Sequence, residues 1–210
     1  MRTSIKTLFA AALATIILGT ASVAANANEN NSNYTNITSV KNITKIKVSG
    51  NVKVILVQDA KESVQVYDNY YAKNALVQQQ DGELRISSFT KEPLTVIAHV
   101  NNLSAIEASN ISNVKTAGNF NLLNLDVVLN DGATADITAN TVNLNTNING
   151  ASSLVLSGST ENYSAVLGAV AKVNTTDFTA TDSNISAAPI VKYSANRYND
   201  IKTDVLEAIF

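Results

Sequence analysis

Apolar and small polar residues alternate along most of the chain, as in β-strands that are buried on one face. Pairs such as Val142/Leu144 and Leu154/Leu156 put branched aliphatic side chains on one face, while Thr, Asn and Ser fill most of the other. A similar alternation starts at Lys45. Because Thr, Val, Ile, Asn and Gly are poor residues for a helix interior, the sequence predicts an all-β protein.

A short sequence motif that ends in small residues recurs between Asn124 and Ser194. Three of its glycines, Gly132, Gly150 and Gly168, are evenly spaced. A repeat of about 20 residues predicts a stacked parallel β-solenoid, because a single repeat cannot bury its own apolar face. A β-sandwich of short hairpins is the competing interpretation, since it also has many evenly spaced strands. The copies are Leu129–Ala133, Ile148–Ala151, Val166–Ala169 and Ile185–Ala188, with a fainter one at Ala108–Val114.

The repeated motif supplies the corners of the predicted solenoid. Asn-Gly and Asp-Gly tolerate the positive φ that a tight corner requires. We therefore expect Gly132, Gly150 and Gly168 to stack in one column. Asn130 and Asn149 are expected to form a hydrogen-bonded ladder between neighbouring strands.

The strand register is open by one residue. If Ile137 and Val173 face inward, Val155 should face inward as well, whereas Leu154 and Leu156 form the more apolar pair. Both registers remain possible from the sequence.

The start of the chain has the pattern of an export signal. Arg2 and Lys6 precede an apolar stretch at Leu8–Leu18, and Ala25-Asn26-Ala27 is a suitable cleavage site. The apolar stretch is too short for a comfortable membrane span. The chain has no Cys, so a lipid anchor on a cysteine and disulfides are not expected. We predict an exported protein of the periplasm, the cell surface or the medium.

The composition divides the remaining chain. An Asn/Ser/Thr-rich stretch with few apolar residues is expected to be a flexible spacer. Asp81-Gly82, between two alternating segments, predicts a β-hairpin in the N-terminal part. The predicted divisions are a signal peptide (1–27), a spacer (28–41), an N-terminal β region (42–100), a repeat solenoid region (101–195) that forms one domain with it, and a C-terminal tail (196–210).

Together these residues resemble the head-GIN-domain auto-transporter adhesin family of exported bacterial proteins. The similarity covers residues 41–195 and implies a right-handed, β-helix-like fold and a cell-envelope location. It supplies no catalytic residues. The chain departs from the family pattern where Asn110 and Ala187 replace corner glycines and where Asn113, Ser153 and Ala171 replace an aspartate. The resemblance rests on Ile46–Val54 with Leu56 and Gln58, and on the corners Ala108–Val114, Gly132–Ile137, Gly150–Leu154, Gly168–Val173 and Ala187–Tyr193.

Charge and composition give no sign of nucleic-acid binding or of a known catalytic motif. The 15 Lys and Arg residues nearly balance the 17 Asp and Glu residues, so no basic surface is expected. His99 is the only histidine, which excludes a histidine metal cluster, and a structural role is expected for it. No catalytic, metal-binding or cofactor-binding residue is predicted.

Acidic residues offer the one alternative chemistry. Asp126, Asp131 and Asp136, with Asp177 and Asp182 further on, could converge to bind Ca²⁺ or to cleave a polysaccharide. We expect them instead at turns and on solvated faces. Lys172 is a candidate ion-pair partner of Asp136.

The densest aromatic residues are Tyr67, Tyr70 and Tyr71. Tyr70 and Tyr71 are the candidate ligand-binding residues, although such tyrosines also cap the ends of cores. The sequence predicts a non-catalytic envelope protein, an adhesin-like binding or scaffolding module that presents polar solenoid faces to a glycan or a cell-surface protein. The alternative is a carbohydrate-active enzyme of the β-helix type, a lyase or a hydrolase. No membrane span is expected after the signal, and the oligomeric state is not predicted.

Overall fold

The computed structural model describes residues 34–67 and 75–188, which contain thirteen β-strands and no helix. The prediction of an all-β protein is therefore confirmed for this part of the chain. The strands are β1 (Thr35–Ile37), β2 (Lys45–Gly50), β3 (Val52–Gln58), β4 (Ser63–Tyr67), β5 (Ala75–Gln80), β6 (Glu83–Ser88), β7 (Leu94–Val100), β8 (Ala105–Ser109), β9 (Asn113–Ala117), β10 (Phe120–Leu129), β11 (Thr134–Ile148), β12 (Ser153–Leu167) and β13 (Lys172–Ala187).

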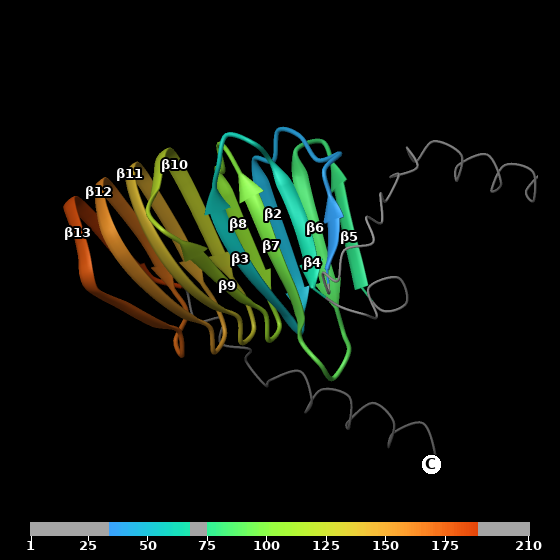
Figure 1. Ribbon diagram of the computed structural model, residues 1–210. Coiled ribbons are helices and arrows are strands. Elements are labelled where there is room, and N and C mark those ends of the chain that lie inside the picture. Colours follow the sequence, from blue (N-terminus) through green and yellow to red (C-terminus); the bar gives the residue numbers. More distant parts are fainter. Residues whose placement is uncertain (1–33, 68–74, 189–210) are drawn as a thin grey trace, which may run out of the picture.

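All thirteen strands belong to one curled sheet (Figure 1). Its order is β1-β4-β7-β3-β9-β11-β10-β8-β2-β6-β5, and β12 joins β11 to β13. Most pairs are parallel; β1 with β4, β4 with β7 and β5 with β6 are antiparallel. The parallel sheet agrees with the predicted stacking and differs from a sandwich of short hairpins.

The sheet curls because its longest strands bend. Residues Thr134–Asp136 of β11 pair with β9, while Ala139–Ile148 of the same strand pair with β10. At the bend, the buried hydroxyl of Thr141 donates a 2.8 Å hydrogen bond to the hydroxyl of Thr160. The sheet therefore has two walls, one containing β3, β7 and β9 and the other containing β2, β6 and β8.

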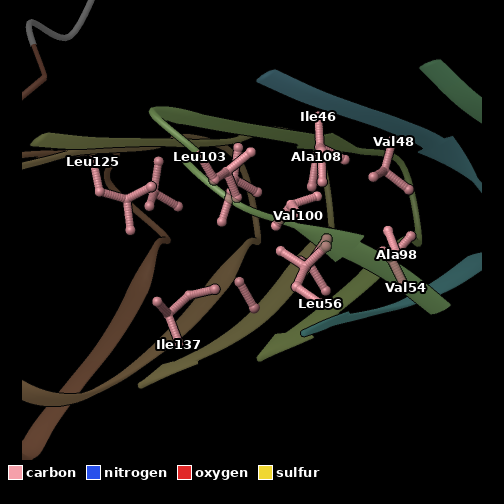
Figure 2. Packing of buried hydrophobic residues seen from close by; sticks show 14 of the residues in the cluster. Ile46, Val48, Val54, Leu56, Ala98, Val100, Leu103, Ala108, Leu125 and Ile137 are labelled. Atoms are coloured by element: carbon pink, nitrogen blue, oxygen red, sulfur yellow. The ribbon is translucent and has the colours of Figure 1, made fainter. Parts of the chain in front are cut away.

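The core lies between these two walls. Figure 2 shows side chains from both walls pointing toward one another, among them Ile46 and Val48 of β2 and Val54 and Leu56 of β3. All four are fully buried. Aliphatic residues at alternate positions thus fill a thin core, as the sequence pattern indicates.

Strands β10, β11 and β12 stack in a constant register, as in the column Leu129, Ile148 and Leu167. The predicted Asn ladder is confirmed: Asn149 Nδ2 donates to Asn130 Oδ1 at 3.1 Å.

The predicted single column of glycines is wrong by one residue at each step. The spacing of the glycines is one residue shorter than the register that joins Leu129 to Ile148 and Ile148 to Leu167. Gly150 consequently lies against Asp131, and Gly168 lies against Asn149. Asp131 takes φ 66° and Gly150 φ 62°, so the corner keeps its left-handed residue although Gly occupies it only once.

The structure also settles the register of the inward residues. Leu154 and Leu156 are buried, and Val155 is 37% exposed. Val173 pairs with Leu154 and Ile137 pairs with Leu156, so both lie in inward columns. The expectation that Val155 would face inward with Ile137 and Val173 took the glycine spacing as the offset between strands, and that spacing is one residue too short.

The N-terminal part contains the predicted hairpin. Asp81 and Gly82 both have positive φ (50° and 78°) and connect the antiparallel strands β5 and β6. β2 pairs with β6 on one side and with β8 on the other, and β3 pairs likewise with β7 and β9. The first parallel strands of the sheet therefore lie between strands that come later in the chain.

The predicted spacer at 28–41 is wrong for its last residues. β1 lies inside that range and pairs with β4. Ile37 and Val40 are buried, with exposed fractions of 8% and 5%. These two apolar side chains and the pairing with β4 attach this otherwise polar stretch to the core. The predicted signal peptide and C-terminal tail lie outside the described residues.

Candidate recognition surface

Rows of hydrogen-bonded amides run across the strands on both sides of the bend in β10, β11 and β12. Asn143 Nδ2 donates to Asn124 Oδ1 at 2.8 Å, and Asn162 Nδ2 donates to Asn143 Oδ1 at 3.0 Å. Two further rows accompany this one. We call the following residues the amide rows: Asn124, Asn143 and Asn162; Asn121, Asn140 and Ser159; and Asp126 with Asn145.

The amide rows fix polar groups in an exposed, regular array. Strands are about 4.8 Å apart, so the side chains repeat at that distance along each row. An Asn that donates one N–H to its neighbour keeps a second N–H and a carbonyl lone pair. These free groups face solvent, because the hydrogen bonds of the rows are exposed. The rows can therefore donate to and accept from a ligand that carries hydroxyl groups.

Only part of this surface was predicted. The Asn130–Asn149 ladder was expected, whereas the amide rows were missed. Their signal is present in the sequence, because Asn124, Asn143 and Asn162 recur at one constant spacing, which is also the spacing of Asn130 and Asn149. The glycines, whose spacing is one residue shorter, conceal this period.

A cluster of charges lies on the outer face of the wall that contains β2, β6 and β8. Lys45 Nζ is 3.2 Å from Glu83 and 3.1 Å from Glu107, and Lys47 Nζ is 2.5 Å from Glu107. Burial alone would raise the pKa of Glu107, but hydrogen bonds from Lys47 and Lys45 outweigh it and hold the pKa below its ordinary value. Hydrogen bonds to Glu107 and Glu83 raise the pKa of Lys45. These charges neutralise one another within the sheet.

The carboxylates considered for catalysis or calcium do not converge. Asp126 accepts a hydrogen bond from Asn145 in the amide rows, and Asp131 accepts one from the backbone N–H of Asn110 at a corner. Asp136 lies on the opposite wall, in the part of β11 that pairs with β9. Asp177 and Asp182 are both exposed on β13. Within 34–67 and 75–188, no three His, Cys, Asp or Glu residues are grouped so that they could hold a metal ion.

The predicted ion pair of Asp136 with Lys172 is wrong. Lys172 pairs in register with Ser153, and the Asp136 column instead contains Val155 and Asn174. Lys115 of β9 takes its place, with Nζ 2.8 Å from the carboxylate of Asp136. The neighbouring strand β9 supplies the cation, and β13 does not.

His99 lies on the outer face of β7, with Nδ1 3.2 Å from Asp59 Oδ2. Asp59 also accepts a hydrogen bond from the backbone N–H of Lys61. The bond from Lys61, followed by the bond to His99, lowers the pKa of Asp59. This arrangement fastens the turn after β3 to β7.

Tyr70 and Tyr71 lie outside the described residues, so their role as ligand-binding residues stays a prediction. The neighbouring Tyr67 is described: its ring centroid is 4.9 Å from that of Tyr34, and its hydroxyl bonds to Gln65. Tyr34 and Tyr67 thus form an aromatic pair beside β1 and β4.

A cavity of 490 Å³ lies near the start of β2, lined by residues that include Lys41, Lys61, Glu62 and Asn101. The sequence did not predict it. The carboxylate of Glu62 accepts backbone hydrogen bonds from Ile43 (3.0 Å) and Asn101 (3.4 Å). Because this carboxylate holds two loops together, it is poorly placed to act on a ligand.

Three solved proteins share this fold at low sequence identity. A putative adhesin from Parabacteroides merdae has a TM-score of 0.53 and 16% identity, over 73% of this chain and 76% of its own. A putative adhesin from Parabacteroides distasonis has a TM-score of 0.55 and 14% identity, over 73% and 77%. A putative lipid binding protein from Parabacteroides distasonis has a TM-score of 0.57 and 10% identity, over 75% and 79%. At these identities the likeness concerns the fold alone.

No curated protein matches the sequence. Over the part of the chain that the structure describes, no helix is long and apolar enough to cross a membrane. The profile of one family, described as "Putative auto-transporter adhesin, head GIN domain", matches residues 42–206. This range contains twelve of the thirteen strands and both walls of the sheet. The chain therefore belongs to the head-GIN-domain adhesin family, as the residues of its opening strands and corners indicate.

Proposed function

We propose that the protein is an exported, non-catalytic module of the cell envelope that binds neutral glycans through the amide rows. The observation that carries this proposal is the exposed array of hydrogen-bonded Asn and Ser side chains at the bend. Membership of the adhesin family supports a location at the cell surface and a binding role.

We also propose that the curled sheet is a β-solenoid. The constant register of β10, β11 and β12 supports it, as does the passage of β11 from one wall to the other. In this arrangement β10, β11 and β12 each add one polar side chain to the rows that begin at Asn121 and Asn124. The array is then built by the stacked turns and not by any special loop.

Amides suit sugars because both partners donate and accept hydrogen bonds. The side chains in the rows are already held by their neighbours, so binding immobilises few additional rotors. Each contact is weak, and affinity comes from engaging several rows at once. The ion-paired cluster at Lys45 contributes little, since its charges are compensated.

The decisive experiment is a glycan array probed with the protein, followed by affinity measurements on any ligand found. Asn143 is the centre of the row that consists of three asparagines, so Asn143→Ala should weaken binding about tenfold, or ~1.4 kcal/mol. Gln78→Ala is the matched control: Gln78 is an exposed amide on β5, at the opposite end of the sheet. It should bind like the unmodified protein.

Three outcomes would contradict the proposal. An equal loss of affinity in Asn143→Ala and Gln78→Ala would show that binding does not depend on the amide rows. Capture of a protein and of no glycan would assign the surface to a protein partner. Cleavage of a bound polysaccharide, lost in Asp126→Ala, would favour the carbohydrate-active enzyme.

A further inference from the structure

The cavity near the start of β2 lies where three connections meet at one end of the strands. These are residues 38–44 before β2, the connection 59–62 after β3 and the one that begins at Asn101 after β7. Its volume of 490 Å³ is within the range of about 300–1,000 Å³ found for small-molecule sites. Apolar and amide side chains both line it: Val40, Ile43 and Ala60, with Asn42, Asn101 and Asn102. The cavity therefore suits a ligand that has both apolar and hydrogen-bonding surfaces.

Lys41 and Lys61 give the lining an excess of positive charge. Among the described residues that line the cavity, Glu62 alone is acidic, and its Oε1 already accepts the N–H groups of Ile43 and Asn101. Neither lysine forms an ion pair with a residue of 34–67 or 75–188. A ligand that complements this lining carries a negative charge.

Side chains from neighbouring elements fix the backbones of both lysines. Gln79 of β5 accepts the N–H of Lys41 at 3.0 Å and donates to the Lys41 carbonyl. Asp59 accepts the N–H of Lys61 at 3.0 Å and is itself bonded to His99. Because the backbone at both positions is already held, binding orders only the two side chains and not the loops.

We propose that this cavity binds a monosaccharide that carries a carboxylate, with the ammonium groups of Lys41 and Lys61 pairing with that carboxylate. The amides of Asn42 and Asn101 both donate and accept hydrogen bonds, as sugar hydroxyls do. The apolar part of the lining lies against the C–H groups of the ring. This site differs from the amide rows, and the inference does not depend on what the rows bind.

The cavity adjoins one amide row through a shared side chain. Gln58 Nε2 donates to the carbonyl of Asn101 at 3.3 Å and to the carbonyl of Asn121 at 3.1 Å, and Gln58 Oε1 accepts the N–H of Asn121 at 2.9 Å. Asn101 lines the cavity, and Asn121 is the first residue of one amide row. A glycan with an acidic sugar can therefore place that sugar in the cavity and its neutral sugars along the row. This extension alone rests on the proposed function.

An NMR titration of the isotope-labelled full chain with sodium D-glucuronate tests the site. Glucuronate should bind with a Kd on the order of 1 mM, as expected for a small ligand held by few contacts. It should shift the backbone amides of Lys61, Asn101 and Asn102. D-Glucose has a similar ring without the carboxylate, and sodium acetate has the carboxylate without the ring. Each should bind at least about tenfold more weakly than glucuronate.

Substitution of the lysines tests their role. Lys41→Met and Lys61→Met keep most of the aliphatic side chain and remove the charge, so each should weaken glucuronate binding about tenfold. Lys91→Met is the matched control, because Lys91 is an exposed lysine at the other end of β7 and outside the cavity lining. It should bind glucuronate like the unmodified protein.

Glu62→Gln should change the affinity in the opposite direction. The amide retains an oxygen that can accept the N–H groups of Ile43 and Asn101, while the negative charge leaves the lining. Glucuronate should then bind about two- to fivefold more tightly. Melting temperatures measured on all four variants are the control for folding.

Shifts confined to residues outside the cavity lining, or equal affinity for glucose and glucuronate, would overturn the proposal. Equal affinity for acetate or inorganic phosphate would also overturn it, because the lysines would then have no preference for a sugar. An equal loss of affinity in Lys91→Met would show a general effect of surface charge and contradict the assignment to Lys41 and Lys61. Glucuronate and the neutral glycans are separate probes, so failure at the cavity and failure at the amide rows are measured independently.

Discussion

Single residues at the corners decide how closely neighbouring strands can stack. Gly150 has φ 62°, and a Cβ there would lie 2.6 Å from the carbonyl oxygen of Asp131. Gly132, one strand earlier, has no positive φ, and its added Cβ would meet only Asn110 O, at 3.4 Å. Gly132 and Gly150 occupy the same place in the repeated motif, but only Gly150 requires a residue without a Cβ.

This difference gives a matched pair of substitutions. Gly150→Ala should lower the free energy of unfolding by about 1–3 kcal/mol, because it combines backbone strain with a steric clash. Gly132→Ala should be within about 0.5 kcal/mol of the unmodified protein. Urea unfolding followed by circular dichroism measures both. Equal effects would show that the corner at Gly150 is not closely stacked.

The Asp136–Lys115 pair illustrates how little an exposed contact contributes. The two side chains are 41% and 56% exposed, and pairs of this kind contribute about 0.2–1 kcal/mol at neutral pH. Asp136→Ala should therefore change stability by no more than about 0.5 kcal/mol. A loss of several kcal/mol in thermal melts would show a role that the geometry does not explain.

Among the elements, the bend inside β11 and β12 depends on two buried hydroxyls. Thr141 and Thr160 bond to each other, and Thr160 also donates to the carbonyl of Val142. Thr160→Val should cost about 1–3 kcal/mol, since it leaves the Thr141 hydroxyl buried without this partner. Replacing both by Val should recover part of that loss, because no orphaned hydroxyl remains. A double variant less stable than the single one would contradict this account of the bend.

The charge cluster on β6, β2 and β8 predicts a pH dependence. The pKa of Glu107 is lower in the folded protein than its ordinary value of 4.5. Its stabilising effect is therefore fully present above pH 4.5 and is lost as the pH falls through the lower folded pKa. Glu107→Gln should flatten the stability profile in that acidic range, whereas the exposed Glu161→Gln on β12 should not. Identical profiles of stability against pH for the two variants would show that the charge cluster does not contribute to acid unfolding.

The elements themselves were largely predictable. Alternation located the strands, and Asp81-Gly82 located the hairpin, because both signals are local. The offset between strands was not predictable from glycine spacing, since Asp131 takes the positive φ that Gly150 takes in the next strand. β1 was missed because a single strand of polar sequence is fixed only by its pairing with β4. The amide rows depend on the register and were missed with it.

At the scale of the whole molecule, the order of strands ties the two halves of the chain together. β2 and β3 lie between strands from both halves, and the buried residues form one cluster. Residues 42–100 and 101–188 should accordingly unfold together. Pulse-labelled hydrogen exchange along a urea titration should give coincident midpoints for peptides from both parts, and two separated midpoints would contradict the single core.

The interleaving of β2 and β3 also bears on how an exported chain can fold. Lys47 of β2 contacts Glu107, 60 residues later, and one edge of β2 and one edge of β3 stay open until β8 and β9 have emerged. Such distant contacts slow folding, because the intervening loop must close first. A chain that crosses a membrane from its N-terminus would present β2 and β3 without their full set of neighbours until β6 to β9 have followed. β2 and β3 thus wait through about three repeat lengths of chain for their last neighbours, whereas β11 and β12 wait for about one, and this delay would keep the early strands open while the chain is translocated.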